Sequence, residues 1–152
     1  MSTVRPATLP DLEALTPLLD GYRVFYQQAS DEAACRAFLQ KRLEQGDSHL
    51  LVHDAGHGLE GFVQLYPLLS TVGLASRWLL NDLFVAPKAR GRGIGQALMQ
   101  AAADVARAHN VPSLMLRTQT HNDAAKALYE SLGWQKNGDF DTYTLTLPET
   151  GS

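Results

Sequence analysis

The sequence has a single cysteine and no long apolar run. Cys35 stands alone among 152 residues, so the chain cannot form an internal disulfide, which is typical of a reducing, cytoplasmic location. No apolar run approaches the ~20 residues that a membrane helix needs, and the first residues have no signal-peptide core. We therefore expect a cytoplasmic protein with no membrane partner.

Positive charge is also scarce. The chain has 16 acidic and 13 basic residues, which gives a formal net charge of −3. An acidic chain is poorly suited to coating a nucleic acid, so no nucleic-acid partner is expected. Apolar residues make up 45% of the sequence, which excludes a disordered chain. The length and the scattered prolines favour a single domain over residues 1–152.

A metal-binding pattern is missing as well. The five histidines show no helical i, i+4 pairing and have no cysteine cluster beside them, so no metal site is expected. Cys35 lies in an alanine-rich helical stretch without an adjacent base pattern, which favours packing over a nucleophilic role.

Hydrophobic periodicity and turn residues predict a mixed α and β chain. Helices are expected from a Thr8–Asp11 capping pattern towards residue 28, with Pro17 bending or interrupting it, and over residues 30–46, 94–109 and 123–132. Strands are expected over residues 2–5, 49–54, 59–69, 78–85 and 113–118, followed by a closing hairpin over 134–147 that turns at Asn137–Gly138. The strand–helix–strand run over residues 78–118 implies one parallel pair. The expected fold class is α/β or α+β, with flanking helices on a mixed, mostly antiparallel central sheet.

A glycine-rich turn joins the strand at 78–85 to the long helix at 94–109. Its glycines leave backbone N–H groups unobstructed at a helix N-terminus, where the macrodipole favours an anion. Three glycines and three basic residues share this turn: Gly91, Gly93, Gly95, Lys88, Arg90 and Arg92. The pattern favours a pyrophosphate ligand, and the alternative is a tight turn with solvated basic side chains.

Two motifs resemble those of the Gcn5-related N-acetyltransferase (GNAT) superfamily. Arg90-Gly-Arg-Gly-Ile-Gly95 matches its Arg/Gln-x-x-Gly-x-Gly/Ala signature, and Asn122 to Trp134 is similar to its Asn-x-x-Ala…Tyr-Glu…Gly-Phe/Trp region. The resemblance implies the acyl-CoA N-acyltransferase fold, acetyl-CoA as cosubstrate without a metal, and acetyl transfer to a primary amine by direct attack in a ternary complex. It extends to the subgroup of histone and polyamine acetyltransferases.

The resemblance also implies how acetyl-CoA binds. Its pyrophosphate would lie on the backbone of the turn, and its pantetheine arm would pair with the strand before the turn, as an added strand does. The implied cofactor-binding residues are Arg90, Gly91, Arg92, Gly93, Ile94 and Gly95 for the pyrophosphate, and Leu83, Phe84 and Val85 for the pantetheine. Asn122 matches a position that contacts the pantetheine, or it caps a helix, and a Thr120–Asp123 capping box would free it for the ligand.

Two residues are candidates for the chemistry. Tyr129 matches the family tyrosine that protonates the departing thiolate, and the alternative is an amphipathic-helix tyrosine with a buried ring. Asn81 stands where relatives place a glutamate base, so Asp82 is the nearest carboxylate, although its side chain faces the other way unless a bulge intervenes. There are two alternatives to Asp82 as the base. Asp82 could anchor a loop at the end of the strand, or a water relay could remove the proton without a dedicated base.

The acceptor is expected to be an amine of a small molecule or a peptide. Tyr22, Phe25 and Tyr26 could form aromatic walls for a cation, with Asp31 and Glu32 nearby or merely capping the second helix. Two other functions stay open: a non-catalytic acyl-CoA-binding sensor, and an interaction domain. A homodimer through an open edge of the hairpin at 134–147 is a further expectation.

Overall fold

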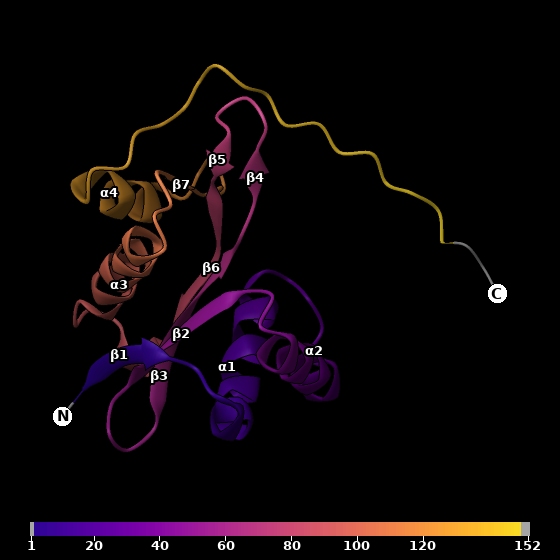
Figure 1. Ribbon diagram of the computed structural model, residues 1–152. Coiled ribbons are helices and arrows are strands. Elements are labelled where there is room, and N and C mark those ends of the chain that lie inside the picture. Colours follow the sequence, from indigo (N-terminus) through magenta and orange to yellow (C-terminus); the bar gives the residue numbers. More distant parts are fainter. Residues whose placement is uncertain (1, 150–152) are drawn as a thin grey trace. The chain divides into compact units, whose positions relative to one another are not determined.

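The computed structural model describes residues 2–149 (Figure 1). It divides into two compact units, with the boundary between Arg117 and Thr118. The first unit holds the large sheet and three α-helices, and the second holds one helix and a long segment without regular structure. The expectation of a single domain stays a prediction. No helix within residues 2–149 is long and apolar enough to cross a bilayer.

The large sheet is mixed and mostly antiparallel, as expected. Its strand order is β1-β2-β3-β6-β7, and only the β6–β7 pair is parallel. A separate two-stranded sheet pairs β4 with β5. The strands are β1 (Thr3–Pro6), β2 (His49–Asp54), β3 (Leu59–Tyr66), β4 (Leu69–Ser70), β5 (Ala75–Ser76), β6 (Trp78–Val85) and β7 (Leu114–Met115).

Helices cover both faces of this sheet (Figure 1). The helices α1 (Leu12–Phe25) and α2 (Glu32–Gln45) lie on one face, and α3 (Ile94–Ala108) lies on the other. Burial of apolar side chains drives this packing. The core on the α1 and α2 face consists of Leu12, Leu15, Leu19, Cys35, Leu39, Leu50, Val52, Phe62 and Phe84.

The start of α1 follows the predicted capping pattern. Thr8 and Asp11 form a capping box on the 3-10 turn Leu9–Asp11, which leads directly into α1. Pro17 lies inside α1, which continues through it, so the interruption allowed by the sequence does not occur. Pro17 removes only the hydrogen bond to the carbonyl of Glu13, and both residues are on the exposed side of the helix, where water can satisfy that carbonyl.

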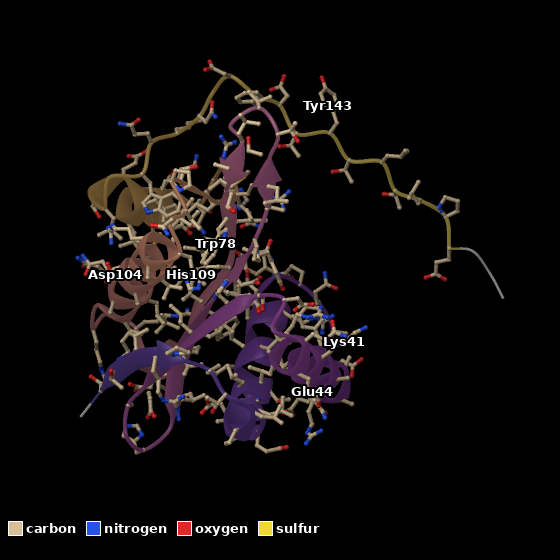
Figure 2. All side chains as sticks on the ribbon, in the orientation of Figure 1. Lys41, Glu44, Trp78, Asp104, His109 and Tyr143 are labelled. Carbon is tan, nitrogen blue, oxygen red and sulfur yellow. The ribbon has the colours of Figure 1, made fainter. Side chains whose placement is uncertain are left out.

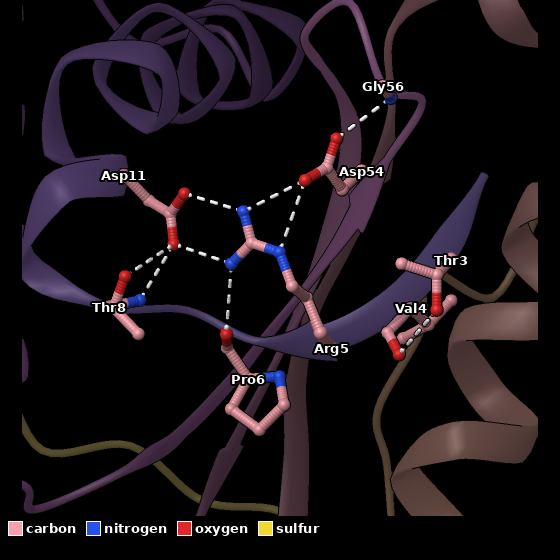
Figure 3. Close-up of polar contacts among 8 residues, drawn as sticks. All are labelled: Thr3, Val4, Arg5, Pro6, Thr8, Asp11, Asp54 and Gly56. Carbon is pink, nitrogen blue, oxygen red and sulfur yellow. Dashed lines mark hydrogen bonds and ion pairs between the residues drawn. The ribbon is translucent and has the colours of Figure 1, made fainter. Parts of the chain in front are cut away.

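Arg5 joins three parts of the first unit (Figure 3). Its two terminal nitrogens each lie 2.8 Å from an Asp11 carboxylate oxygen, and its Nε and Nη2 donate to Asp54 Oδ2 at 3.2 and 3.1 Å. The hydrogen bonds from Arg5 lower the pKa of Asp11 to about 2. This network ties β1 to the first helical turn and to the end of β2.

Aromatic rings pack β2 and β6 against the C-terminal end of α3. His49 stacks on Trp78 with ring centroids 4.1 Å apart, and His109 lies 5.2 Å from Trp78 (Figure 2). Burial, followed by the nearby His109, lowers the pKa of His49. Two of the five histidines therefore take part in ring packing.

The expected hairpin over 134–147 is wrong: residues 134–149 contain no strand. Asn137 accepts a hydrogen bond from the N–H of Asp139 at 3.1 Å, which is a local turn without cross-strand pairing. The apolar side chains of this segment are exposed, Tyr143 at 91% and Leu145 at 82%. A two-stranded hairpin is marginal without a third strand or a helix to cover it. The expected dimer through a hairpin edge therefore loses its basis.

Two smaller differences concern the sheet. The expected strand 59–69 ends at Tyr66, and the short β4–β5 sheet follows it. The expected strand 113–118 is reduced to the two residues of β7, Leu114 and Met115. Both differences arise where pairing, a non-local property, decides how far a strand extends.

Candidate active site

A bulge in β6 decides where Asp82 points. Asp82 pairs with Gln64 of β3, and the next pair is Leu80 with Leu65, so Asn81 is the extra residue. Asp82 lies two residues from Phe84, which belongs to the core on the α1 and α2 face, so the two side chains share that face. Asn81 is exposed. The sequence predicted that Asp82 could replace the missing glutamate only if a bulge changed the direction of its side chain, and this bulge is present.

The Asp82 carboxyl is half-buried and hydrogen-bonded from three elements. Burial raises its pKa, and hydrogen bonds from Asn81, Tyr22 and Gln64 act in the opposite direction. The Asn81 amide lies 3.1 Å from each carboxylate oxygen. A carboxyl with a raised pKa beside a strand bulge has the property that a general base needs at neutral pH.

Within residues 2–149, β6 has a strand partner on one side only beyond its first two residues. Its parallel pairing with β7 covers Trp78↔Leu114 and Leu79↔Met115, and β7 ends there. In the described part of the chain, residues 80–85 therefore pair only with β3. Leu83, Phe84 and Val85 lie in this stretch, where an extended ligand could pair with the free side of the strand.

The glycine-rich turn presents free backbone donors at the start of α3. Gly91 and Gly93 have φ of 82° and 78°, in the left-handed region that favours glycine. No residue within 2–149 accepts a hydrogen bond from the N–H groups of residues 91–95. The Arg90 N–H bonds instead to the Pro87 carbonyl at 3.5 Å. The donors suited to an anion are thus those of residues 91–95.

The arginines of the turn contact the protein through their side chains. Arg90 Nε donates to the Val85 carbonyl at 3.0 Å, and its guanidinium lies 5.7 and 5.5 Å from the ring centroids of Phe25 and Phe84. Arg92 Nη1 lies 3.6 Å from Glu60 Oε2. Arg90 therefore links the turn to the C-terminal end of α1, and Arg92 links it to β3.

Glu60 also faces a buried histidine. His53 Nδ1 lies 3.6 Å from Glu60 Oε1, and His53 is 7% exposed. Within the described residues this Nδ1 has no hydrogen-bond partner. Glu60 thus stands between an imidazole and the Arg92 guanidinium.

The aromatic residues of α1 divide between the core and the surface. The Tyr22 ring lies 5.7 Å from both Phe62 and Phe84 and 5.1 Å from Tyr26, measured between centroids. Phe25 is 54% exposed. Tyr22 therefore packs on the sheet beside Asp82, while Phe25 and Tyr26 reach the surface.

Asp31 and Glu32 belong to the start of α2. Asp31 caps the helix by accepting a hydrogen bond from the Ala34 N–H at 3.1 Å, and Glu32 is its first residue. The capping alternative is confirmed for Asp31, while Glu32 lies in the first turn, where the helix macrodipole favours an acidic side chain.

The second unit carries the other two predicted residues. Asn122 caps α4 (Asp123–Ser131), with its Oδ1 accepting from the Ala125 N–H at 3.2 Å, so the Thr120–Asp123 box is not what caps this helix. Tyr129 lies in α4 with its ring centroid 6.4 Å from that of Trp134. The roles of Asn122 in cofactor binding and of Tyr129 as an acid stay predictions.

Comparisons with known proteins identify the family. The sequence profile of the Acetyltransferase (GNAT) family matches residues 13–134. The chain belongs to this family. This GNAT chain is 41% identical to the uncharacterized N-acetyltransferase YhfO of Bacillus subtilis, over 95% of this chain and 97% of that protein. It is 36% identical to a probable acetyltransferase of Haemophilus influenzae, over 62% of this chain and 65% of that one.

Solved structures agree with the GNAT assignment. The crystal structure of a probable acetyltransferase superposes with a TM-score of 0.90 at 36% identity, covering 97% of this chain and 99% of that chain. An aminoglycoside acetyltransferase, meta-AAC0020, has a TM-score of 0.82 at 18% identity, which shows the fold alone. The chain is thus an N-acetyltransferase with the α+β GNAT fold, and the family implies acetyl-CoA as its cosubstrate.

The GNAT cosubstrate fits the residues present. The free N–H groups of residues 91–95 suit its pyrophosphate, and the free side of β6 suits its extended arm. Within residues 2–149 no three histidine, cysteine or acidic side chains gather as a metal site would require.

Sequence reasoning missed Gln64 in this GNAT site. Gln64 is 2% exposed and pairs with Asp82. A signal was present, because Gln64 interrupts the apolar run Phe62-Val63-Gln64-Leu65 in a strand that is buried on both faces. A buried amide needs polar partners, which predicts other polar groups around it.

Proposed function

We propose that this GNAT enzyme acetylates a primary amine of a small molecule or peptide by direct attack in a ternary complex, with Asp82 as the general base. The observation that carries the proposal is the Asp82 carboxyl itself: it is half-buried, has a raised pKa, and lies beside the bulge where β6 is free on one side. An alkylamine near pKa 10.4 is almost entirely protonated at neutral pH, so the reaction needs a group that removes its proton.

The cosubstrate supplies a thioester, whose carbonyl carbon is the electrophile. The backbone of Gly91, Arg92, Gly93, Ile94 and Gly95 would hold its pyrophosphate, with Arg90 supporting the turn through Val85. The backbone of Leu83, Phe84 and Val85 would hold its arm, and an N–H there could stabilise the oxyanion.

The proton transfers would fall to two side chains. Asp82 would accept the proton of the amine as the carbon–nitrogen bond forms. Tyr129 would protonate the thiolate as the carbon–sulfur bond breaks, because a phenol near pKa 10 is protonated at neutral pH. Asn122 would contact the arm of the cosubstrate through the part of its amide that does not cap α4.

The acceptor would bind near the aromatic end of α1. Tyr22, Phe25 and Tyr26 offer ring faces for a cation beside the Asp82 carboxyl. This arrangement agrees with a polyamine- or lysine-type acceptor, in line with the histone and polyamine subgroup. The buried, free thiol of Cys35 agrees with a cytoplasmic location.

The test measures thiol release from acetyl-CoA over a panel of amines. We expect turnover that depends on a particular amine, and a fall in kcat of about 10²–10⁴-fold in Asp82→Asn, with loss of the acidic limb of the pH–rate profile. Asp104→Asn, an exposed carboxylate on α3, is the matched control and should behave as the wild type (Figure 2). An unchanged pH–rate profile in Asp82→Asn would exclude Asp82 as the base. Acetyl-CoA binding without turnover on any amine would favour a sensor.

A further inference from the structure

We propose that Gln64 is a positioning residue for the reaction, whose side-chain amide holds the Asp82 carboxylate in place beside the bulge and joins it to the Tyr66 phenol. The consequence for catalysis rests on the proposed role of Asp82 as the base. The proposed role does not require Gln64 to touch the reacting atoms, because Gln64 acts through Asp82.

The register of the sheet places Gln64 opposite Asp82. The two residues form a direct pair between β3 and β6, and the register shifts immediately after Gln64. Directly paired side chains lie on the same face of a sheet, with Cβ atoms about 4.5–5.5 Å apart. That separation is within reach of a hydrogen bond between the Gln64 amide and the Asp82 carboxylate, and Gln64 acts to lower the pKa of Asp82, as a donor to the carboxylate does.

Ser48 fixes which end of the Gln64 amide faces Asp82. The Ser48 hydroxyl donates to Gln64 Oε1 at 2.7 Å. With its carbonyl committed to Ser48, the amide directs its two N–H donors away from Ser48. The Gln64 amide acts to lower the pKa of both Asp82 and Tyr66, as its N–H donors would, and these are the polar groups that a side chain only 2% exposed needs beside it.

The Gln64 amide lies beside two ionisable groups, Asp82 and Tyr66, and it favours the ionised form of Asp82. Burial raises the pKa of Asp82, while the hydrogen bonds from Asn81, Tyr22 and Gln64 favour the carboxylate. Burial and the nearby Asp82 raise the pKa of Tyr66 to about 12, so its phenol stays protonated at neutral pH. Arg42 and Asp47 are the other charged groups that act on Tyr66.

Gln64 therefore does two things for Asp82. It offsets part of the burial that would otherwise keep the carboxyl protonated, and it fixes the carboxylate on the face of β6 that α1 covers. The chain of side chains Ser48–Gln64–Asp82 runs from the residue before β2 through β3 to β6. A chain of this kind restricts the rotamers of each member.

The test titrates Asp82 directly. Carboxyl carbon NMR of the wild type and of Gln64→Met, which keeps the side-chain length without the amide, should show a higher Asp82 pKa in the variant. The acidic limb of kcat/KM should move to higher pH by the same amount, with the KM for acetyl-CoA unchanged. Gln100→Met, at an exposed position of α3, is the matched control and should move neither quantity.

Each outcome decides one point. An Asp82 pKa that is the same in Gln64→Met and the wild type overturns the inference. A raised Asp82 pKa with an unmoved acidic limb upholds the Gln64–Asp82 coupling and overturns Asp82 as the base. If Gln64→Met does not fold, Ser48→Ala replaces it, because loss of the bond to Oε1 releases the amide. The same upward shift is then expected, and its absence overturns the inference.

Discussion

Gln64 and Asp82 face each other across β3 and β6 at the last regular pair before the bulge at Asn81. This pairing turns a carboxyl into the face of the sheet that α1 covers and gives it an amide partner there. The unpaired side of β6 follows directly along the strand. The proposed proton acceptor and the proposed surface for an extended ligand are thus built from the same few residues of one strand.

Tyr129→Phe should lower kcat by about 10²–10⁴-fold and leave the affinity for acetyl-CoA nearly unchanged, because the variant keeps the ring and loses only the proton donor. Tyr143→Phe is the matched control, since Tyr143 is 91% exposed in the segment after α4. Steady-state kinetics and calorimetric titration of acetyl-CoA check both. If chemistry limits the rate and kcat does not change in Tyr129→Phe, Tyr129 is not the acid.

Gly93→Ala should weaken acetyl-CoA binding. A Cβ at Gly93 meets no neighbouring atom within 4 Å, so the cost comes from φ of 78°, at about 1–2 kcal/mol. Relief of that strain would rotate the N–H groups away from the anion. Gly138→Ala, at a glycine that also has open space around it, should bind acetyl-CoA as the wild type does. Equal affinities of Gly93→Ala and Gly138→Ala would remove residues 91–95 from the pyrophosphate site.

The Asp11–Arg5 pair should make stability depend on pH in the acid range. The pKa of Asp11 is lowered from 3.8 to about 2 in the folded chain, so its contribution is complete above pH 3.8 and is lost as the pH falls towards 2. We expect a loss of about 1–2 kcal/mol over that range. Urea unfolding of the wild type and Asp11→Asn between pH 2 and 7 measures it. The stability gap between the two should close as the pH falls, and a constant gap would contradict the assignment.

Gly61→Ala should destabilise the first unit by about 1–3 kcal/mol, as overpacking does. A Cβ there would lie 2.8 Å from the Phe84 carbonyl oxygen and 3.1 Å from Leu98 Cδ1, so β3 and β6 would have to part or α3 would have to move. Thermal unfolding gives the change, with Gly138→Ala again as the control. If Gly61→Ala melts at the wild-type temperature, the sheet accommodates the added Cβ without loss of stability, and the prediction is wrong.

Local signals explain what the sequence predicted well. The capping box at Thr8 and Asp11, the left-handed Gly46 that ends α2, and the start of α3 after Gly93 depend on a few neighbouring residues. The glycine-rich turn belongs to this group. Its donors and backbone conformation follow from the residues that compose it.

Pairing between distant segments explains what the sequence did not predict. The bulge at Asn81 exists only relative to β3, so the direction of Asp82 stayed open until the register was known. Gln64 became part of the site for the same reason. The Asn137–Gly138 turn signal was local too, but the strands on either side of it needed a partner that residues 134–149 do not have.

Because Gly61 has no side chain, the N-terminal end of α3 can approach β3 closely. Ile94 and Leu98, in the first turns of α3, pack on β3 at Gly61. Their side chains are 6% and 0% exposed. The first turns of α3 are therefore packed against β3 through contacts that do not involve an anion. A receptor ordered in advance loses little conformational entropy on binding, so more of the attraction between the N–H groups and a pyrophosphate remains as affinity.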